Sequence, residues 1–191
     1  MNKPVKIKGR AWVLKTDDGK GLNDIDTDQI YHNSHLAVTD INLMGQYALG
    51  NLKGWENFPT LVQKGDILIA GENFGAGSSR QQAVDCFTAL GITLLICESY
   101  GAIYKRNAIN SGLPILTCSG ITDKNSVKSG DILEVDLDTG QIINKTNNKE
   151  ILALNFSSVQ MDIYQSGNLF VYGQNLKTPL KVSTNIGRAS I

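Results

Sequence analysis

The chain has 191 residues, 41% of them hydrophobic and 19% charged, which suits one globular domain with a real core. Lysine plus arginine and aspartate plus glutamate both number 18, so no net charge favours nucleic acid or an anionic membrane as a partner. No apolar run reaches the length of a membrane span, and no apolar segment follows the basic N-terminal residues. We therefore predict a cytoplasmic protein without a signal peptide.

The N-terminal part begins with a strand and continues into polar loops. Residues 5–14 mix β-branched and aromatic residues with basic ones, which is typical of a strand. An acidic loop occupies residues 23–30. Thr39 and Asp40 then offer N-caps for a helix that ends near Gly50.

The centre of the chain predicts an alternation of strands and helices. Three short apolar runs indicate strands buried on both faces: residues 66–70, 93–97 and 114–118. Helical patterns lie between them at about residues 80–90 and 100–111, and Gly91 and Gly112 close these helices. The expected arrangement is β-α-β-α-β with parallel strands and right-handed crossovers.

The C-terminal third predicts a hairpin and an irregular tail. Residues 131–137 alternate in polarity, and residues 141–144 can return beside them. The segment from 174 to 191 is polar and irregular. We predict a single α/β domain over residues 1–191, with a core at about 5–165 and a central mixed, largely parallel sheet.

The loop at residues 71–80 carries the clearest chemical signal. Its glycines precede a helix, so main-chain N–H groups and the helix dipole can converge on an anion. Ser78 and Ser79 add hydroxyl groups, and the Arg80 guanidinium fits a carboxylate bidentately. A Walker loop would need lysine where Ser78 follows Gly77, and a dinucleotide fingerprint would need a small residue in place of Arg80. The loop predicts a site for a small anion.

A purely structural interpretation of the two serines is equally open at this point. Ser78 with Gln81, or Ser79 with Gln82, forms a capping-box pattern that would only start the helix. The two interpretations are compatible, because one serine can cap the helix while its neighbour faces a ligand.

Three segments resemble the aconitase swivel domain. Residues 73–80 resemble its Gly-x-Gly-Ser-Ser-Arg signature loop, and residues 26–30 are similar to its Asp-Thr-Asp motif. Residues 104–114 resemble a third shared stretch, and the three motifs follow the family order across roughly residues 5–120. The resemblance implies an aconitase-like swivelling β/β/α domain that is a separate small subunit, as in 3-isopropylmalate dehydratase.

The resemblance also implies roles for these residues. The reaction would be the dehydration and rehydration of a small hydroxy-dicarboxylate. Ser78 would be the catalytic base, Ser79 and Arg80 would hold a substrate carboxylate, and Asp28 would belong to the site. A [4Fe–4S] cluster would lie on a large partner subunit. This chain would bind no metal, since its three cysteines are widely spaced: Cys86, Cys97 and Cys118.

Substrate choice in this family depends on a loop that follows the Asp-Thr-Asp motif. The matching positions here are His35, Leu36, Ala37 and Val38, with histidine in place of the usual tyrosine and without the arginine that holds a third carboxylate. The segment favours a substrate with an apolar substituent, such as isopropylmalate. The resemblance then implies a reaction of leucine biosynthesis. Citramalate, dimethylmalate or homoaconitate-type substrates remain open, and so does a carboxylate-binding module without catalysis.

Two further assignments follow from the sequence. Asp24 and Asp26 suit an Asx-rich turn, whereas a calcium loop of the EF-hand type is excluded by the spacing. Trp55 and Phe58 fit either the core under the sheet or a partner interface.

Overall fold

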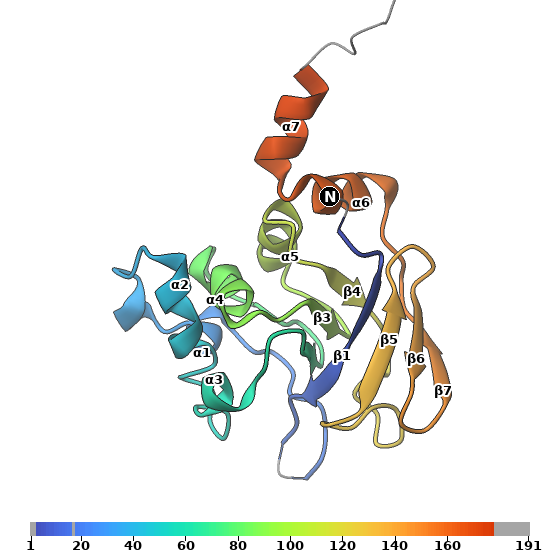
Figure 1. Ribbon diagram of the computed structural model, residues 1–191. Coiled ribbons are helices and arrows are strands. Elements are labelled where there is room, and N and C mark those ends of the chain that lie inside the picture. The colour runs from blue at the N-terminus through green and yellow to red at the C-terminus, as the bar shows by residue number, and fades with distance from the viewer. Residues whose placement is uncertain (1–2, 17, 178–191) are drawn as a thin grey trace, which may run out of the picture.

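The computed structural model describes residues 3–16 and 18–177 and contains one seven-stranded sheet in the order β4-β3-β2-β1-β5-β6-β7 (Figure 1). The strands are β1 (Lys6–Val13), β2 (Ile67–Ala70), β3 (Leu94–Cys97), β4 (Ile115–Thr117), β5 (Ile132–Asp136), β6 (Gln141–Asn144) and β7 (Lys149–Leu152). Neighbours from β4 to β1 are parallel, and those from β1 to β7 are antiparallel. The predicted α/β class and mixed sheet are confirmed, with an antiparallel share as large as the parallel one.

Most helices lie on one side of the parallel half, and the last two lie at one end of the sheet (Figure 1). The α-helices are α1 (Thr27–Ile30), α2 (Ile41–Met44), α3 (Phe58–Leu61), α4 (Gln82–Leu90), α5 (Ala102–Asn110), α6 (Ser158–Ser166) and α7 (Leu169–Lys177). Two 3₁₀ turns, η1 (Asn33–His35) and η2 (Gly45–Tyr47), lie before α3. Asp40 caps α2 as expected, through a 2.9 Å hydrogen bond from the Asn42 N–H.

The parallel half matches the expectation from the apolar runs. Every residue of β2 and β3 is buried, because helices pack on one face of these strands and the second core covers the other. The two connections contain α4 and α5, and Gly91 ends α4 in the left-handed conformation with φ of 78°.

Strand β1 joins the two halves of the sheet. Its residues 11–13 pair with β2 in parallel, whereas residues 6–10 pair with β5 in antiparallel orientation. One face of the sheet packs on a core that includes Phe58, which is fully buried, with Trp55 half-buried against it. Of the two possibilities left open for Phe58, the core is confirmed.

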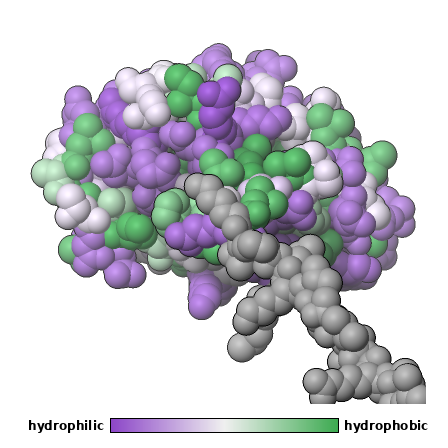
Figure 2. Space-filling model, turned by 90° about the horizontal axis from the view of Figure 1, so that it is seen from above, coloured by the Kyte–Doolittle hydropathy of each residue, from purple (hydrophilic) through white to green (hydrophobic). Residues whose placement is uncertain are grey.

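The C-terminal part contains elements that the sequence did not predict: β7, α6 and α7. Helix α7 continues through Lys177, so the predicted irregular tail starts too early at residue 174. The remainder of that tail, residues 178–191, lies outside the described residues. Within the described ranges, no helix is long and apolar enough to cross a bilayer. Hydrophobic residues on the upper face are scattered among hydrophilic ones (Figure 2).

Candidate functional site

The loop at residues 71–80 leaves the carboxyl end of β2 and leads into α4. It lies against the segment that precedes α1, because Gly75 N–H donates to the Ile25 carbonyl at 2.7 Å and Thr27 N–H donates to the Ala76 carbonyl at 2.9 Å. This pairing brings the Asp-Thr-Asp segment beside the signature loop, at the end of the parallel strands where α/β proteins gather their ligands.

Gly75 shows why the loop needs glycine. Its φ is 76°, which is unfavourable for other residues, and any Cβ at this position would collide with the ring of Tyr104 on α5. Tyr104 belongs to the third motif at residues 104–114. The signature loop is therefore seated directly on that motif.

Neither serine of the loop caps the helix. Helix α4 begins at Gln82 with Gln81 at the N-cap position, and no side chain makes the capping hydrogen bond. Ser78 is exposed, and its hydroxyl has no hydrogen-bond partner in the described part of the chain. Ser79 is also exposed and accepts a 3.3 Å hydrogen bond from the Asn107 amide. The capping-box interpretation is wrong, and the serine side chains are available to a ligand.

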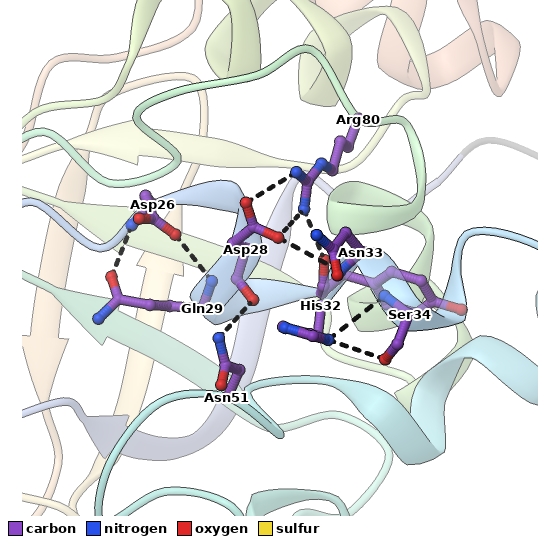
Figure 3. A network of polar contacts seen from close by, with 9 residues as sticks. Asp26, Asp28, Gln29, His32, Asn33, Ser34, Asn51 and Arg80 are labelled. Carbon is purple, nitrogen blue, oxygen red and sulfur yellow. Dashed lines mark hydrogen bonds and ion pairs between the residues drawn. The ribbon is translucent and has the colours of Figure 1, made fainter.

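Arg80 and Asp28 form a two-pronged ion pair (Figure 3). Arg80 Nη1 and Nη2 lie 2.5 Å and 2.8 Å from the two carboxylate oxygens of Asp28, and Nη1 also donates to the Tyr31 carbonyl at 3.2 Å. These hydrogen bonds hold the pKa of Asp28 below its usual value. The side chain of Arg80 is 12% exposed, so its guanidinium is held in one orientation.

Several hydrogen-bond donors at this place remain unused. A guanidinium has five N–H groups, and the contacts to Asp28 and Tyr31 engage three of them. The Nε–H and one Nη2–H therefore have no acceptor among the described residues. The main-chain N–H groups of residues 77–82 likewise donate to no acceptor in the described protein. These unused donors belong to residues 77–82, within four positions of the exposed Ser78 along the chain.

The neighbouring aspartates have structural roles. Asp26 caps α1 by accepting from the Gln29 N–H at 2.8 Å, while the Gln29 side chain accepts from the Asp26 N–H (Figure 3). Asp24 accepts a 2.8 Å hydrogen bond from the Asn73 amide. The local role predicted for Asp26 is confirmed, whereas the contact of Asp24 joins it to a residue 49 positions away. Of the three aspartates, Asp28 alone hydrogen-bonds to Arg80.

His35 is stacked on an aromatic ring that the sequence did not single out. The rings of His35 and Tyr47 lie 4.0 Å apart, centroid to centroid, at an angle of 15°. The Tyr31 hydroxyl donates to the His35 carbonyl at 3.1 Å, and the Tyr31 carbonyl accepts from Arg80. Tyr31 therefore connects the predicted specificity segment to the signature loop.

The rest of that segment presents apolar side chains. Leu36 is 38% exposed and Ala37 is exposed, whereas Val38 is half-buried against the core. One connection to Arg80 runs through His35 and Tyr31. A second runs from Leu36 N–H to the Asn33 carbonyl and from Asn33 N–H to Asp28. The structure thus gives the segment an apolar surface that is linked to the ion pair of Arg80 and Asp28.

The cysteines are poor candidates for metal ligands. All three are buried and free, and burial raises their pKa values, to about 12 for Cys97 and about 11 for Cys118. Protonated thiols do not bind metals, since the thiolate is the ligand. Over residues 3–16 and 18–177, no group of three or more His, Cys, Asp or Glu side chains could hold a metal ion.

Comparison with known proteins assigns the fold to a family. Residues 54–120 match the model of the Aconitase C-terminal domain. The small subunit of an isopropylmalate/citramalate isomerase from Methanocaldococcus jannaschii is 39% identical over 166 residues, covering 87% of this chain and 92% of that protein. The chain belongs to the aconitase family, among its 3-isopropylmalate dehydratase-type small subunits. This similarity extends well beyond the matched domain, into the antiparallel half.

Other members of these small subunits support the fold and show diversity of substrate. A crystal structure of 3-isopropylmalate dehydratase from the same organism superposes with a TM-score of 0.79 at 36% identity, covering 90% of this chain and 95% of that one. A methanogen homoaconitase small subunit from M. jannaschii is also 39% identical, over 87% of this chain and 90% of its own length. Overall identity alone does not distinguish these substrates.

The site contains residues that sequence analysis missed. Tyr31, Tyr47 and Asn107 each contact a predicted site residue, although none was assigned a role. Asn107 lies in the third motif, so the motif could have indicated a site residue there, and the Asn107 amide does donate to the Ser79 hydroxyl. Tyr31 and Tyr47 gave no signal, because their contacts with Arg80 and His35 depend on how the loops fold together.

Proposed function

We propose that this chain is the small subunit of a 3-isopropylmalate dehydratase-type hydro-lyase, active only with a large subunit, and that Ser78 is its catalytic base. The observation that carries the proposal is the exposed, unpartnered Ser78 hydroxyl among unused N–H donors. The substrate would be a small hydroxy-dicarboxylate, with the reaction belonging to leucine biosynthesis.

The donors around Ser78 supply what a serine base requires. A serine hydroxyl is weakly basic, and its alkoxide needs a positive local potential. The free N–H groups of residues 77–82, the positive end of the α4 dipole and the nearby guanidinium of Arg80 all contribute to that potential. As alkoxide, Ser78 takes a proton from carbon, the electron pair forms a C=C bond, and hydroxide leaves the adjacent carbon. The hydroxide takes up a proton and Ser78 loses its own, so that the base is regenerated and water is the net product.

Arg80 is prepared to hold a substrate carboxylate. Asp28 and Tyr31 occupy one edge of the guanidinium, which leaves Nε–H and one Nη2–H, and these can bind two carboxylate oxygens. The Ser79 hydroxyl adds a further donor. In this account Asp28 orients Arg80 and does not touch the substrate.

The leaving hydroxyl requires a Lewis acid, and the described residues include no group of side chains that could hold a metal ion for this purpose. The [4Fe–4S] cluster expected on the large subunit would supply a Lewis acid for it. The buried thiols of the present chain do not suit that role. A partner that covers the exposed serines would also exclude water from the site.

The apolar segment after His35 favours substrates without a third carboxylate. Leu36 and Ala37 offer aliphatic surface, and no lysine or arginine occurs at residues 35–38. Isopropylmalate fits this chemistry, and the smaller citramalate and dimethylmalate are the alternatives. Homoaconitate-type substrates, with an additional carboxylate, are disfavoured.

The decisive test is Ser78→Ala in a complex reconstituted anaerobically with the cognate large subunit. We expect loss of turnover by a factor on the order of 10³ or more, because the base is removed, with unchanged folding and subunit association. Ser158→Ala, an exposed serine at the start of α6, is the matched control and should retain activity. Formation of the unsaturated product is followed by absorbance for isopropylmalate, citramalate, dimethylmalate and homocitrate.

The same experiment separates catalysis from simple carboxylate binding. A chain that associates with no cluster-bearing subunit, yet binds dicarboxylates through Arg80, would support the non-catalytic module. Activity of Ser78→Ala near that of the unmodified complex would refute the assignment of Ser78 as base.

A further inference from the structure

A cavity of about 530 Å³ lies at the opposite end of the parallel strands from the signature loop. Residues immediately before β3 and β4 form one wall, and the start of β1 with the end of α6 forms the other. None of the residues assigned to the hydro-lyase site lines it. Its volume falls within the range of small-molecule sites, roughly 300–1,000 Å³.

The cavity exists because β1 is longer than its parallel neighbour. β1 begins at Lys6, but its pairing with β2 starts only at Ala11. At Gly9 the chain is closely approached by the Gly65 carbonyl, which any Cβ at position 9 would strike. Toward its N-terminus β1 therefore has one edge with no strand beside it in the described protein, and this edge faces the cavity.

Main-chain donors on that edge are unpaired. Val5 accepts a hydrogen bond from Leu137 N–H, and Ala11 N–H donates to the Asp131 carbonyl, so odd-numbered residues of β1 bond toward β5. Hydrogen bonding alternates along an antiparallel pair. The N–H and C=O groups of the even-numbered Lys6 and Lys8 consequently point away from β5, on the side of the cavity that both residues line, so that two N–H donors face it between main-chain carbonyls.

Three lysines give the cavity a positive potential. Lys3, Lys6 and Lys8 all line it, and no carboxylate does so within the described chain. Lys3 Nζ lies 4.8 Å from the centre of the Tyr164 ring, and partial burial lowers the pKa of Lys3. Lys6 is 3.8 Å from Asp136. Lys8, in contrast, lies opposite Glu134 in the pairing of β1 with β5 but has no carboxylate within 4 Å of its ammonium among the described side chains. An anion in the cavity would pair with the Lys8 ammonium.

The opposite wall is apolar. Ile92, Leu113 and Pro114 contribute aliphatic surface close to the lysines. We propose that this cavity binds a small organic anion, whose carboxylate meets the Lys8 ammonium and the free N–H groups of β1 and whose apolar body packs on the aliphatic wall. The site is separate from the signature loop, and the proposal does not depend on the hydro-lyase function.

Three probes of related shape test the chemistry of the cavity. The full chain is titrated by calorimetry with 4-methylpentanoate, with 4-methylpentanamide, which lacks the charge, and with acetate, which lacks the apolar body. We expect 4-methylpentanoate to bind at least about tenfold more tightly than the other two, since charge-assisted hydrogen bonds and apolar burial both contribute. Equal binding of the three probes, or no binding, would overturn the proposal.

Substitutions then locate the binding. Lys8→Met removes the free ammonium but keeps an unbranched side chain, and should weaken 4-methylpentanoate binding about tenfold. Lys128→Met, at an exposed lysine before β5, is the control and should have no effect. Arg80→Lys should also leave this binding unchanged. Loss of binding in Arg80→Lys but not in Lys8→Met would place the probe at the signature loop and refute the cavity site.

Discussion

The parallel and antiparallel halves of the sheet use their polar residues in different ways. In β2 and β3 every residue is buried, so polar side chains occur in the loops that follow, where Ser78 and Ser79 are exposed and available. In β6 a polar side chain lies inside: Asn144 is fully buried and donates to Asp131 at 2.7 Å. The exposed polar residues of the candidate site thus follow strands that are covered on both faces, while the antiparallel half has a hydrogen bond between buried polar side chains.

After the loss expected for Ser78→Ala, the next largest effect should distinguish the two ends of the parallel strands. Arg80→Lys removes the bidentate fork, so the reconstituted enzyme should show a higher KM and a lower kcat, with kcat/KM reduced on the order of a hundredfold. Arg10→Lys is the matched control, because Arg10 pairs with Asp66 through two hydrogen bonds at the other end of β2. Steady-state kinetics should show near-normal kcat/KM for Arg10→Lys. Equal losses in both variants would contradict the localisation of function to the signature loop.

A stability measurement probes the antiparallel half. Asn144→Ala leaves the buried Asp131 without one partner, so the free energy of unfolding should fall by about 2 kcal/mol. Asn147→Ala, at an exposed turn in the same hairpin, should cost less than about 1 kcal/mol. Urea denaturation measures both changes. The kcat/KM of the folded Asn144→Ala complex should stay near that of the unmodified enzyme, and a tenfold fall would remove the functional distinction between the halves.

The smallest expected effect concerns the stacked rings of the specificity segment. Tyr47→Ala removes the ring under His35, and such a pair contributes about 0.5–1.5 kcal/mol, so the preference between isopropylmalate and citramalate should change by about threefold to tenfold. Tyr47→Phe keeps the ring and should preserve the preference. The readout is the ratio of kcat/KM for the two substrates. An equal fall in kcat/KM for both substrates would show that Tyr47 supports the structure without affecting substrate preference.

Much of the fold could be predicted from local patterns. Apolar runs between glycines predicted β2, β3 and β4, and helical periodicity predicted α4 and α5. The missed strand β7 contains mainly exposed residues, and Leu152 within it is 74% exposed, so no alternation marked it. Helix α6 buries only Ile163 and Tyr164, which gave too weak a pattern for a helix.

The candidate site likewise contains residues that local sequence reveals and contacts that only the tertiary fold creates. The signature residues could be found because they are adjacent in the chain. The pairing of Arg80 with Asp28 spans 52 positions and arises only when the loop after β2 folds against the segment before α1. Sequence analysis assigned both residues to the site and predicted that Arg80 binds a substrate carboxylate, but it did not predict the ion pair between Arg80 and Asp28. The stack of His35 on Tyr47 likewise depends on tertiary packing.

The double role of β1 has a mechanical consequence. This strand is held in register from both sides, in parallel by β2 and in antiparallel by β5, and a slip of one residue would turn Ile7, Ala11 and Val13 out of the core. The parallel and antiparallel halves of the sheet therefore cannot shift relative to each other along β1. We therefore expect all seven strands to move together as one rigid body in any motion of this chain relative to a partner protein.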